Sequence, residues 1–304
     1  MLNSAPPPPV DFRRTRVAFM TASRFLVSLV AAWLLAGAAS AASPTLDRIK
    51  ASGTVTFGYR DGAAPFSAKQ RNGKVRGYSV ELCEKVAAAV ARALNLENLK
   101  IAWRPVDGES RISDVADRKI DAECGTTTIT LSRMERVDFS VPIFVDGATA
   151  LVRAKDALRQ LADLKGKRVA VMPSTTTETS LKKALALAGL SANFIMVKDG
   201  NEGVAAVLAG KADAYASDRM LLTQLKADDN RADELEFLQH DFSFEPYGLV
   251  LPRDDPEFRL LVNRTLAGLY KTGEIDPIFI HWLAPYGRPG PLLNAMYYLN
   301  ALPD

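Results

Sequence analysis

Histidine and cysteine are scarce in this chain of 304 residues, which has two of each. They are His240, His281, Cys83 and Cys124. Two of each is too few for a zinc ribbon or another metal cluster of cysteine and histidine, although the count does not exclude a carboxylate-rich metal site. We therefore expect no metal ion and no other cofactor.

The sequence also lacks the common catalytic motifs. It contains no G-x-S-x-G turn, no G-x-x-x-x-G-K-[ST] loop, no G-x-G-x-x-G and no H-E-x-x-H. These motifs place a nucleophile, a phosphate-binding loop or a zinc ion in a hydrolase, nucleotidase or dehydrogenase. Their absence argues against an enzyme without excluding one.

Most of the chain has no excess of charge of either sign, because its basic and acidic side chains balance. Of 38 basic and 35 acidic side chains, four arginines and one aspartate lie in residues 1–41, which leaves 34 of each sign in the rest. A neutral body has no electrostatic reason to bind nucleic acid or an anionic membrane. The composition, 48% hydrophobic and 24% charged, is typical of a folded globular protein, and the length is typical of two domains.

Only one apolar run is long enough to compare with a membrane span. It covers residues 25–36, after a basic segment at 11–16 and before Ala39-Ser40-Ala41. A span needs ~20 residues, so a membrane anchor is the weaker interpretation. The pattern predicts a signal peptide over residues 1–41, with export of a soluble protein to a bacterial periplasm.

Export bears on the two cysteines. Cys83 shares a predicted helix face with Val86 and Val90, and Cys124 shares a predicted strand face with Ile120. Both are therefore expected to be buried. An oxidising compartment permits a disulfide, but two buried thiols fit the pattern equally well, so both alternatives stay open.

Predicted strands and helices alternate along the rest of the chain. This alternation predicts parallel α/β sheets with helical crossovers. Two extended stretches, 144–151 and 242–248, would carry the chain to a second lobe and back, leaving a cleft between two sheets. The predicted strands cover 54–59, 99–104, 120–123, 145–153, 168–172, 194–197, 212–216 and 249–251, and the predicted helices cover 79–94, 112–118, 158–161, 177–188, 203–208, 219–227, 256–271 and 275–283.

Arginines and hydroxyls gather where predicted strands end or helices begin. Buried hydroxyls need polar partners, and arginine can hold a carboxylate in bidentate fashion. An aspartate at another strand end could accept from an ammonium group. Together these groups predict a site for an α-amino acid. The segments are 58–66 with Arg60, 109–112 with Arg111, 123–133 with Thr126, Thr128 and Arg133, 172–178 with a capping box and Thr176, and 216–218 with Asp218.

Several stretches resemble the periplasmic solute-binding proteins of ABC importers for polar amino acids, and most of all the glutamate/aspartate-binding branch. The resemblance runs from about Leu46 to the C-terminus. It rests on Gly53-Thr-Val-Thr-Phe-Gly-Tyr-Arg60, Pro65-Phe66, Gly77-Tyr-Ser79, Asp121-Ala-Glu-Cys-Gly-Thr-Thr-Thr128, Arg136-Val-Asp-Phe-Ser140, Ala162-Asp-Leu-Lys-Gly-Lys167, Ser217-Asp218 and the tail from Pro291.

The resemblance implies a type II clamshell of two α/β lobes joined by two hinge strands. Lobe 1 would comprise residues 42–147 plus 247–304, and lobe 2 residues 148–246. The protein would be a monomer that captures glutamate or aspartate without chemistry and delivers it to permease subunits in the inner membrane.

The resemblance also implies a role for each site residue. Arg133, with Thr128 and Thr176, would hold the ligand α-carboxylate. Asp218 would accept from the ammonium group, with the backbone near Thr126 also in contact. Arg60 and Arg111 would bind the side-chain carboxylate.

Two positions depart from the pattern of that branch. Gly108 stands where the branch has a hydroxyl, and Gly200 where it has a histidine. A longer dicarboxylate, or another polar amino acid, therefore stays open as the ligand. The enzyme alternative is a periplasmic cyclohexadienyl or arogenate dehydratase on the same fold, which would need a general acid in the cleft. A sensory module would need a signalling domain.

Overall fold

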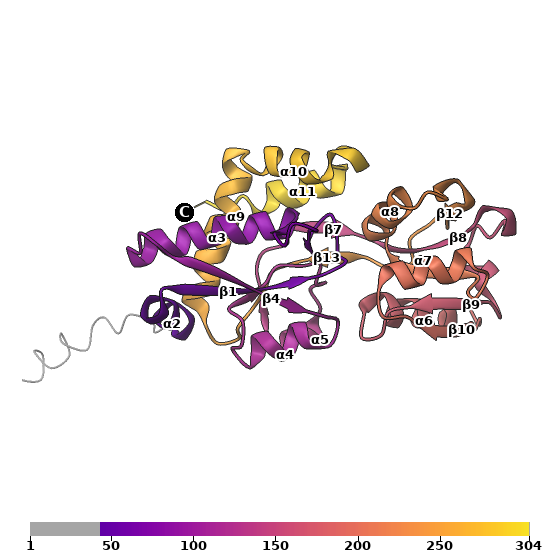
Figure 1. Ribbon diagram of the computed structural model, residues 1–304, viewed down its shortest axis with the longest axis horizontal. Coiled ribbons are helices and arrows are strands. Elements are labelled where there is room, and N and C mark those ends of the chain that lie inside the picture. The colour runs from indigo at the N-terminus through magenta and orange to yellow at the C-terminus, as the bar shows by residue number, and fades with distance from the viewer. Residues whose placement is uncertain (1–42, 304) are drawn as a thin grey trace, which may run out of the picture. The chain divides into compact units, whose positions relative to one another are not determined.

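The computed structural model describes residues 43–303, so the predicted signal peptide lies outside the described residues. Two five-stranded sheets organise this part of the chain, and a pair of short strands, β7 (Phe144–Asp146) and β13 (Glu245–Tyr247), lies between them (Figure 1). Among residues 43–303, no helix combines the length and the apolar character that crossing a membrane requires.

The first sheet has the strand order β4-β1-β5-β14-β6. β1 pairs in parallel with β4 and β5, whereas β14 is antiparallel to β5 and β6. Its strands are β1 (Thr54–Arg60), β4 (Lys100–Val106), β5 (Ala122–Glu123), β6 (Asp138–Phe139) and β14 (Val250–Leu251), and its helices are α2 (Pro44–Ser52), α3 (Tyr78–Leu94), α4 (Ser110–Ala116), α5 (Leu131–Met134), α9 (Pro256–Thr272), α10 (Ile275–Leu283) and α11 (Pro291–Asn300).

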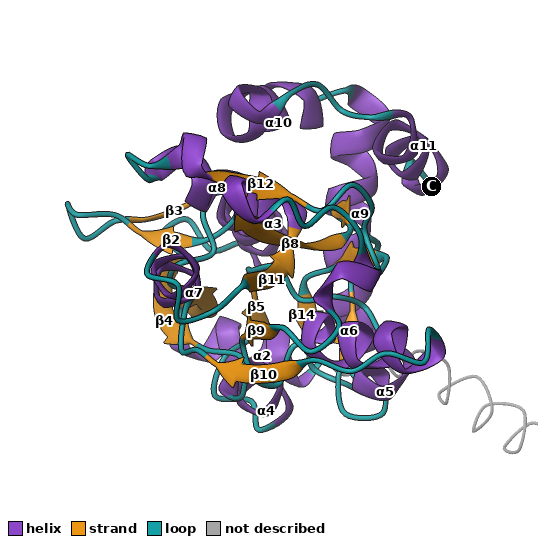
Figure 2. Cartoon of the chain, turned by 90° about the vertical axis from the view of Figure 1, so that its right-hand side faces the viewer, coloured by secondary structure: helices purple, strands orange, loops and turns teal. Residues whose placement is uncertain are grey.

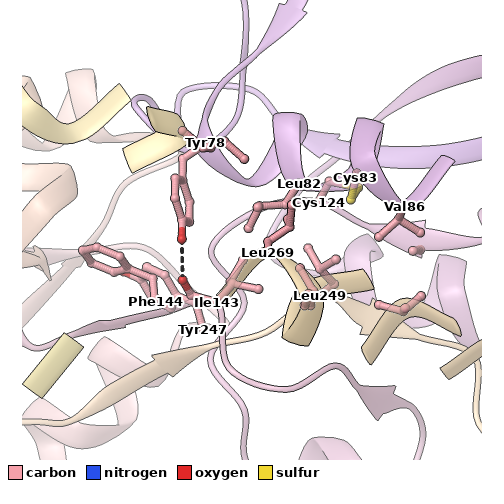
Figure 3. Close-up of a cluster of buried hydrophobic side chains, with 14 of the residues drawn as sticks. Tyr78, Leu82, Cys83, Val86, Cys124, Ile143, Phe144, Tyr247, Leu249 and Leu269 are labelled. Atoms are coloured by element: carbon pink, nitrogen blue, oxygen red, sulfur yellow. Dashed lines mark hydrogen bonds between the residues drawn. A yellow bond between two sulfur atoms is a disulfide. The ribbon is translucent and has the colours of Figure 1, made fainter. Parts of the chain in front are cut away.

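Alternation along the strands sorts the side chains of this sheet onto two faces. Val55 and Phe57 of β1 join the large core that α3 and α9 cover, while Val250 of β14 packs with α4 on the other face. Figure 3 shows part of the large core, in which the Tyr78 hydroxyl donates to the carbonyl of Ile143 at 2.8 Å.

The second sheet has the strand order β10-β9-β11-β8-β12. β8 is antiparallel to β11 and β12, and the other pairs are parallel. Its strands are β8 (Ala148–Arg153), β9 (Arg168–Val171), β10 (Asn193–Met196), β11 (Ala214–Asp218) and β12 (Leu235–Phe237), and its helices are α6 (Thr176–Leu187), α7 (Gly200–Leu208) and α8 (Arg219–Asp228).

Helices cover both faces of the second sheet (Figure 2). Ala150 and Val152 of β8 pack in the cluster that includes Leu181 of α6. Leu151, between them, packs with Leu222 of α8 on the opposite face. Burial on both faces explains why β8 and β9 are mostly apolar.

The two connecting strands, β7 (Phe144–Asp146) and β13 (Glu245–Tyr247), pair in antiparallel fashion. β8 follows β7, and β14 follows β13. Each connecting strand therefore leads into a strand that runs antiparallel to its neighbours in the sheet. This arrangement makes both sheets mixed, and the expectation of parallel sheets was wrong for β8 and β14. The direction of a strand that follows a crossing between the sheets depends on the course of the whole chain. The local pattern of apolar residues does not report it.

Smaller elements also differ from the expectation. In place of a helix at 158–161, the structure has two 3-10 turns, Ala154–Asp156 and Leu161–Leu164. The unpredicted elements include α2, α5, α11, β6, β12, the hairpin of β2 (Ala68–Lys69) and β3 (Val75–Arg76), and the 3-10 turns Ala232–Glu234 and Ala284–Tyr286.

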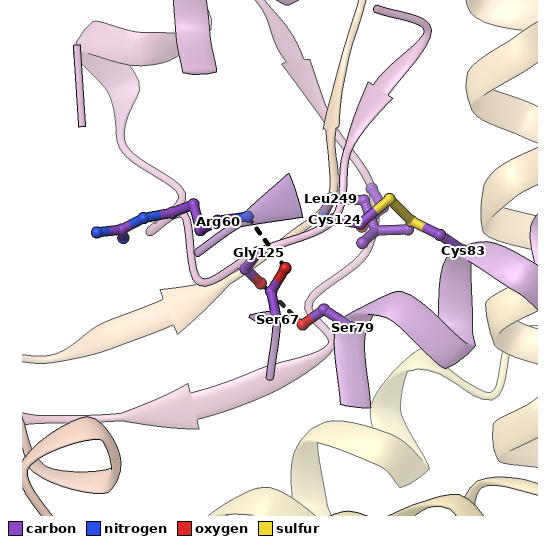
Figure 4. The surroundings of a disulfide bond; sticks show 8 residues. Arg60, Ser67, Ser79, Cys83, Cys124, Gly125 and Leu249 are labelled. Carbon is purple, nitrogen blue, oxygen red and sulfur yellow. Dashed lines mark hydrogen bonds between the residues drawn. A yellow bond between two sulfur atoms is a disulfide. The ribbon is translucent and has the colours of Figure 1, made fainter. Parts of the chain in front are cut away.

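Cys83 and Cys124 form a disulfide, which decides the alternative that the sequence left open. The bridge joins α3 to the residue that follows β5 (Figure 4). Beside it, the Ser79 hydroxyl donates to the Gly125 carbonyl at 2.8 Å. The loop after β5 is therefore anchored to α3 at two successive residues.

Candidate functional site

All seven predicted site residues line one cavity between the two sheets. Its enclosed volume is about 30 Å³. That volume holds on the order of one or two water molecules, so the cavity as it stands is smaller than an amino acid. The lining residues are Arg60, Arg111, Thr126, Thr128, Arg133, Met172, Thr175, Thr176, Thr177, Ala216, Ser217, Asp218 and Leu221.

One wall of the cavity comes from the first sheet and its helices. Arg60 ends β1, Arg111 lies in the first turn of α4, and Arg133 belongs to α5. Thr126 and Thr128 lie in the loop that follows β5. Carboxyl ends of parallel strands meet at one edge of a sheet, which brings these segments together.

The opposite wall comes from the second sheet. Thr176 is the first residue of α6, whose cap is Thr175, and Asp218 ends β11. The two walls touch directly. The hydroxyls of Thr128 and Thr176 lie 3.2 Å apart, and Arg111 Nη2 donates to the Ser174 carbonyl at 3.4 Å.

Each of the three arginine side chains donates only one hydrogen bond to the described part of the protein. Arg60 Nη1 donates to the Thr126 hydroxyl at 3.2 Å, and Arg133 Nη1 to the Thr128 carbonyl at 2.6 Å. In the described part of the chain, none of the three forms an ion pair with a carboxylate. The wall therefore holds three cations with spare donors.

Arg111 is the most deeply buried of the three arginines, so water stabilises its charge least. Its residue is 2% exposed, and its Nε and Nη1 atoms have no hydrogen-bond partner within residues 43–303. Burial, with the nearby Arg60 and Arg133 guanidinium groups, lowers the pKa of Arg111 to about 9. The group still carries its charge at neutral pH, and a buried charge without partners is costly. The position favours an anion.

Glu123 is close enough to the three arginines for their charges to act on its carboxyl group. It was not predicted as a site residue. It is fully buried, and neither of its oxygens has a hydrogen-bond partner in the described residues. Burial raises the pKa of Glu123, while the charge of Arg111 opposes that rise. A Cβ on Gly125 would come within 2.0 Å of the Glu123 carboxylate, so only glycine leaves room for it.

Asp218 is 7% exposed and accepts two hydrogen bonds. Thr177 Oγ1 donates to it at 2.9 Å and the Tyr247 hydroxyl at 2.6 Å. Burial, and then the charge of Glu245, raises the pKa of Asp218. The carboxylate thus lies in a site where a cation would stabilise its charge.

Tyr247 and Glu245 were missed although both lie in the predicted extended stretch 242–248. Glu245 is 1% exposed and accepts from the hydroxyls of Thr128, Thr176 and Ser243 at 2.6, 2.7 and 2.6 Å. The signal available in the sequence was a glutamate inside an aromatic segment, Phe242-Ser-Phe-Glu-Pro-Tyr247, where an ionisable group needs a buried partner.

A second cavity of about 170 Å³ adjoins the first and shares Arg60, Met172, Ser217 and Leu221 with it. Gly108 and Gly200, the two departures from the family pattern, both line it, and so does Lys198. A Cβ on Gly108 would lie 3.2 Å from Arg111 Nη1. A Cβ on Gly200 would lie 2.5 Å from Leu225 Cδ1, so a side chain at either glycine would press on a residue of the cavity wall or of the arginine cluster.

A larger hollow, about 780 Å³, lies elsewhere, over α3 and α10. None of the predicted site residues lines it. Residues 43–303 also contain no group of three histidine, cysteine or acidic side chains arranged to hold a metal ion. The candidate site is therefore the smaller cavity, which has buried charges that need a ligand.

The sequence profile of the bacterial extracellular solute-binding proteins, family 3, matches residues 55–285. The chain belongs to this family. An L-glutamate/L-aspartate-binding protein of Pseudomonas aeruginosa is 36% identical over 252 residues, which is 82% of this chain and 83% of the relative. The glutamate/aspartate import solute-binding protein of Escherichia coli is 33% identical, over 81% of each chain.

Solved structures agree with the two-lobed fold. An ancestral arginine-binding protein bound to arginine is 28% identical, with a TM-score of 0.68 over 76% of this chain and 99% of the other. The ancestral amino acid-binding protein AncCDT-1, a precursor of cyclohexadienyl dehydratase, is 29% identical, with a TM-score of 0.68 over 79% of this chain and 99% of the other. The chain is therefore a two-lobed solute-binding protein.

Proposed function

We propose that this solute-binding protein captures glutamate or aspartate in the periplasm, as a monomer, and delivers it to the permease of an ABC importer in the inner membrane. The observation that carries the proposal is the charge pattern of one cavity. Three guanidinium groups, which form no ion pair within residues 43–303, face Asp218 across a small cavity. A dicarboxylic amino acid carries the complementary charges, two negative and one positive. The names of the two curated relatives support the same ligands.

Each charge of such a ligand has a partner. The α-carboxylate would lie against Arg133 and the backbone N–H groups at the start of α6, where the helix dipole favours an anion. The ammonium group would lie against Asp218. The side-chain carboxylate would lie between Arg60 and Arg111, and would supply the partners that Arg111 lacks.

Entry of the ligand requires the walls to separate, because the cavity is smaller than an amino acid. We propose that lobe 1, residues 42–147 plus 247–304, and lobe 2, residues 148–246, move apart about β7 and β13. The contact between Thr128 and Thr176 and the hydrogen bond from Arg111 to the Ser174 carbonyl would have to break, because each joins the two lobes. Residues 1–41 would be removed as a signal peptide on export.

We further propose that the site binds without catalysis. A dehydratase would need a carboxyl group free to give a proton to its substrate. Glu123, whose oxygens lack hydrogen-bond partners in the described residues, does not line the cavity. Asp218 does line it, and both of its oxygens accept hydrogen bonds, from Thr177 and Tyr247, which suits holding a cation. Incubation with prephenate and with arogenate should give no change in product absorbance, whereas turnover of either would overturn this part of the proposal.

A longer dicarboxylic amino acid is a second candidate ligand, and the cavity beside Gly108 and Gly200 favours it. Calorimetry with aspartate, glutamate and 2-aminoadipate separates the candidates. One more buried methylene contributes ~0.8 kcal/mol, about fourfold in affinity, if the adjoining space is used. Gly108→Ser should then reduce 2-aminoadipate binding more than glutamate binding.

Calorimetry with Arg133→Ala tests the proposal as a whole. We expect the purified wild-type protein to bind glutamate with a dissociation constant near 1 µM, about −8 kcal/mol. Arg133→Ala should abolish measurable binding, because it removes the charge that faces the α-carboxylate. Normal glutamate affinity in Arg133→Ala, or no acidic amino acid bound by the wild type, would refute it.

A further inference from the structure

Glu245 lies on β13, one of the two strands that connect the sheets. Its carboxylate contacts residues of the cavity wall on the side away from the cavity. The residue is almost completely buried and pairs across the strands with Asp146 of β7. It does not line the cavity itself. It instead contacts two residues that do, Thr128 and Thr176, which come from opposite walls.

The direction of the hydroxyl hydrogens of Thr128 and Thr176 decides whether these hydroxyls can donate a hydrogen bond to a ligand or only accept one. Both hydroxyls donate to the same atom, Glu245 Oε2, at 2.6 and 2.7 Å. A hydroxyl has one hydrogen and two lone pairs. With both hydrogens directed to Glu245, the two oxygens have only lone pairs to offer to the cavity. They can accept from an ammonium group but cannot donate to a carboxylate.

Ser243 holds Glu245 in this orientation. Its hydroxyl donates to Oε1 at 2.6 Å, so both carboxylate oxygens are engaged. A glutamate fixed at both oxygens cannot turn its Oε2 away without losing hydrogen bonds in a buried place, which is costly. In the closed arrangement of the two walls, the protein itself therefore sets the direction of both threonine hydroxyls.

The charge distribution points the same way. The charge of Glu245 raises the pKa of Asp218, next in effect to burial, so the two carboxylates are close enough to repel each other. The pKa of Arg133, which burial lowers, is raised again by Glu245, so this carboxylate also lies near the arginine wall. A positive group placed between Asp218 and the two threonines would relieve the repulsion.

We propose that Glu245 is a positioning residue that turns Thr128 and Thr176 into hydrogen-bond acceptors and so makes the site select ligands with an ammonium group. The proposal rests on the proposed function and adds a specificity determinant to it. The carboxylate of the ligand would then be held by Arg133 and by backbone N–H groups rather than by the threonine hydroxyls.

Glu245→Gln is the variant that tests this role, because it keeps the shape and adds a donor where an acceptor stood. The two probes are glutamate and glutarate, which differ only in the ammonium group. We expect Glu245→Gln to lower the ratio of glutamate to glutarate affinity at least tenfold, since the freed hydroxyls can turn towards a carboxylate. Glu234→Gln, an exposed glutamate outside both cavities, is the matched control and should leave the ratio unchanged.

Thr176→Val provides a second route if Glu245→Gln folds poorly. It removes one acceptor while Glu245 stays, and should also lower the ratio. In the double variant the two effects should add only in part, because both act through the Thr176 hydroxyl while Glu245 also acts through Thr128.

Equal losses for both ligands, or an unchanged ratio, would overturn the proposal and leave Glu245 a structural residue. A wild-type protein that binds neither ligand would instead refute the proposed function, and the selective role would fall with it.

Discussion

The two walls of the candidate site differ in how far the protein satisfies their charges. The wall from the first sheet has three arginines, and two nitrogens of Arg111 lack any partner in residues 43–303. The opposite wall has Asp218, whose oxygens accept from Thr177 and Tyr247. The cationic wall thus has donors to spare, while the acidic wall is already hydrogen-bonded.

This difference assigns different tasks to the two walls. Ligand carboxylates would satisfy donors that are otherwise unpaired, so the cationic wall should supply most of the affinity. Asp218 accepts one hydrogen bond at each oxygen and keeps further lone pairs that can accept from an ammonium group, so the acidic wall should supply selectivity. Four variants test this comparison.

The largest expected effect is on the scaffold of the cationic wall, which alone has a disulfide. Cys83→Ala/Cys124→Ala opens a loop of 41 residues, and chain entropy predicts a loss of about 4 kcal/mol in the free energy of unfolding. Chemical denaturation measures this loss. Glutamate affinity should change only severalfold, because Ser79 still holds the Gly125 carbonyl. Unchanged stability would show that the bridge does not support this wall.

Helix α3 and the three arginines of this wall could be predicted from the sequence, whereas α2, α5 and α11 were missed. The spacing of Val80, Cys83, Val86 and Val90 predicted a helix over 79–94, and α3 spans Tyr78–Leu94. Apolar periodicity is local, so it survives in a single sequence. The disulfide was not decided, because burial of each cysteine says nothing of the distance between them.

The second wall was predicted less completely. Asp218 was found because it ends an apolar strand. Glu245 and Tyr247 were missed because their roles depend on β13 returning beside β7, a pairing between residues about a hundred positions apart. Short strands such as β6 and β12 were also missed, since two or three residues give no measurable period.

The next effect concerns the acidic wall. Asp218→Ala should weaken glutamate about thirtyfold, roughly 2 kcal/mol, as expected for removing a charged hydrogen-bond partner. Glutarate, which has no ammonium group, should lose far less. Calorimetry with both ligands measures the difference. An equal loss for both would mean that this wall supplies general affinity rather than selectivity.

The smallest effect is a pH dependence at the junction of the walls. Asp146 accepts from the Met220 and Gly147 amides and the Tyr247 hydroxyl, yet burial and the charge of Asp218 raise the pKa of Asp146 to about 7. The folded protein therefore binds this proton more tightly than the unfolded chain does. The stability that it contributes is present at low pH and is lost as the pH rises through about 7.

Asp146→Asn should remove this contribution. Denaturation at about pH 5 and about pH 8 should show a smaller fall in stability for the variant than for the wild type. The same slope in both proteins would place the titrating group elsewhere.

Thermal unfolding of the wild type and Arg111→Met, with and without glutamate, tests the central claim most directly. If Arg111 is a buried cation that awaits a ligand carboxylate, the methionine variant should melt at a higher temperature than the wild type without ligand, because replacing a buried charge with an apolar side chain of similar length removes its desolvation cost. Glutamate should raise the melting temperature of the wild type only. A variant that is less stable than the wild type and is still stabilised by glutamate would contradict the account.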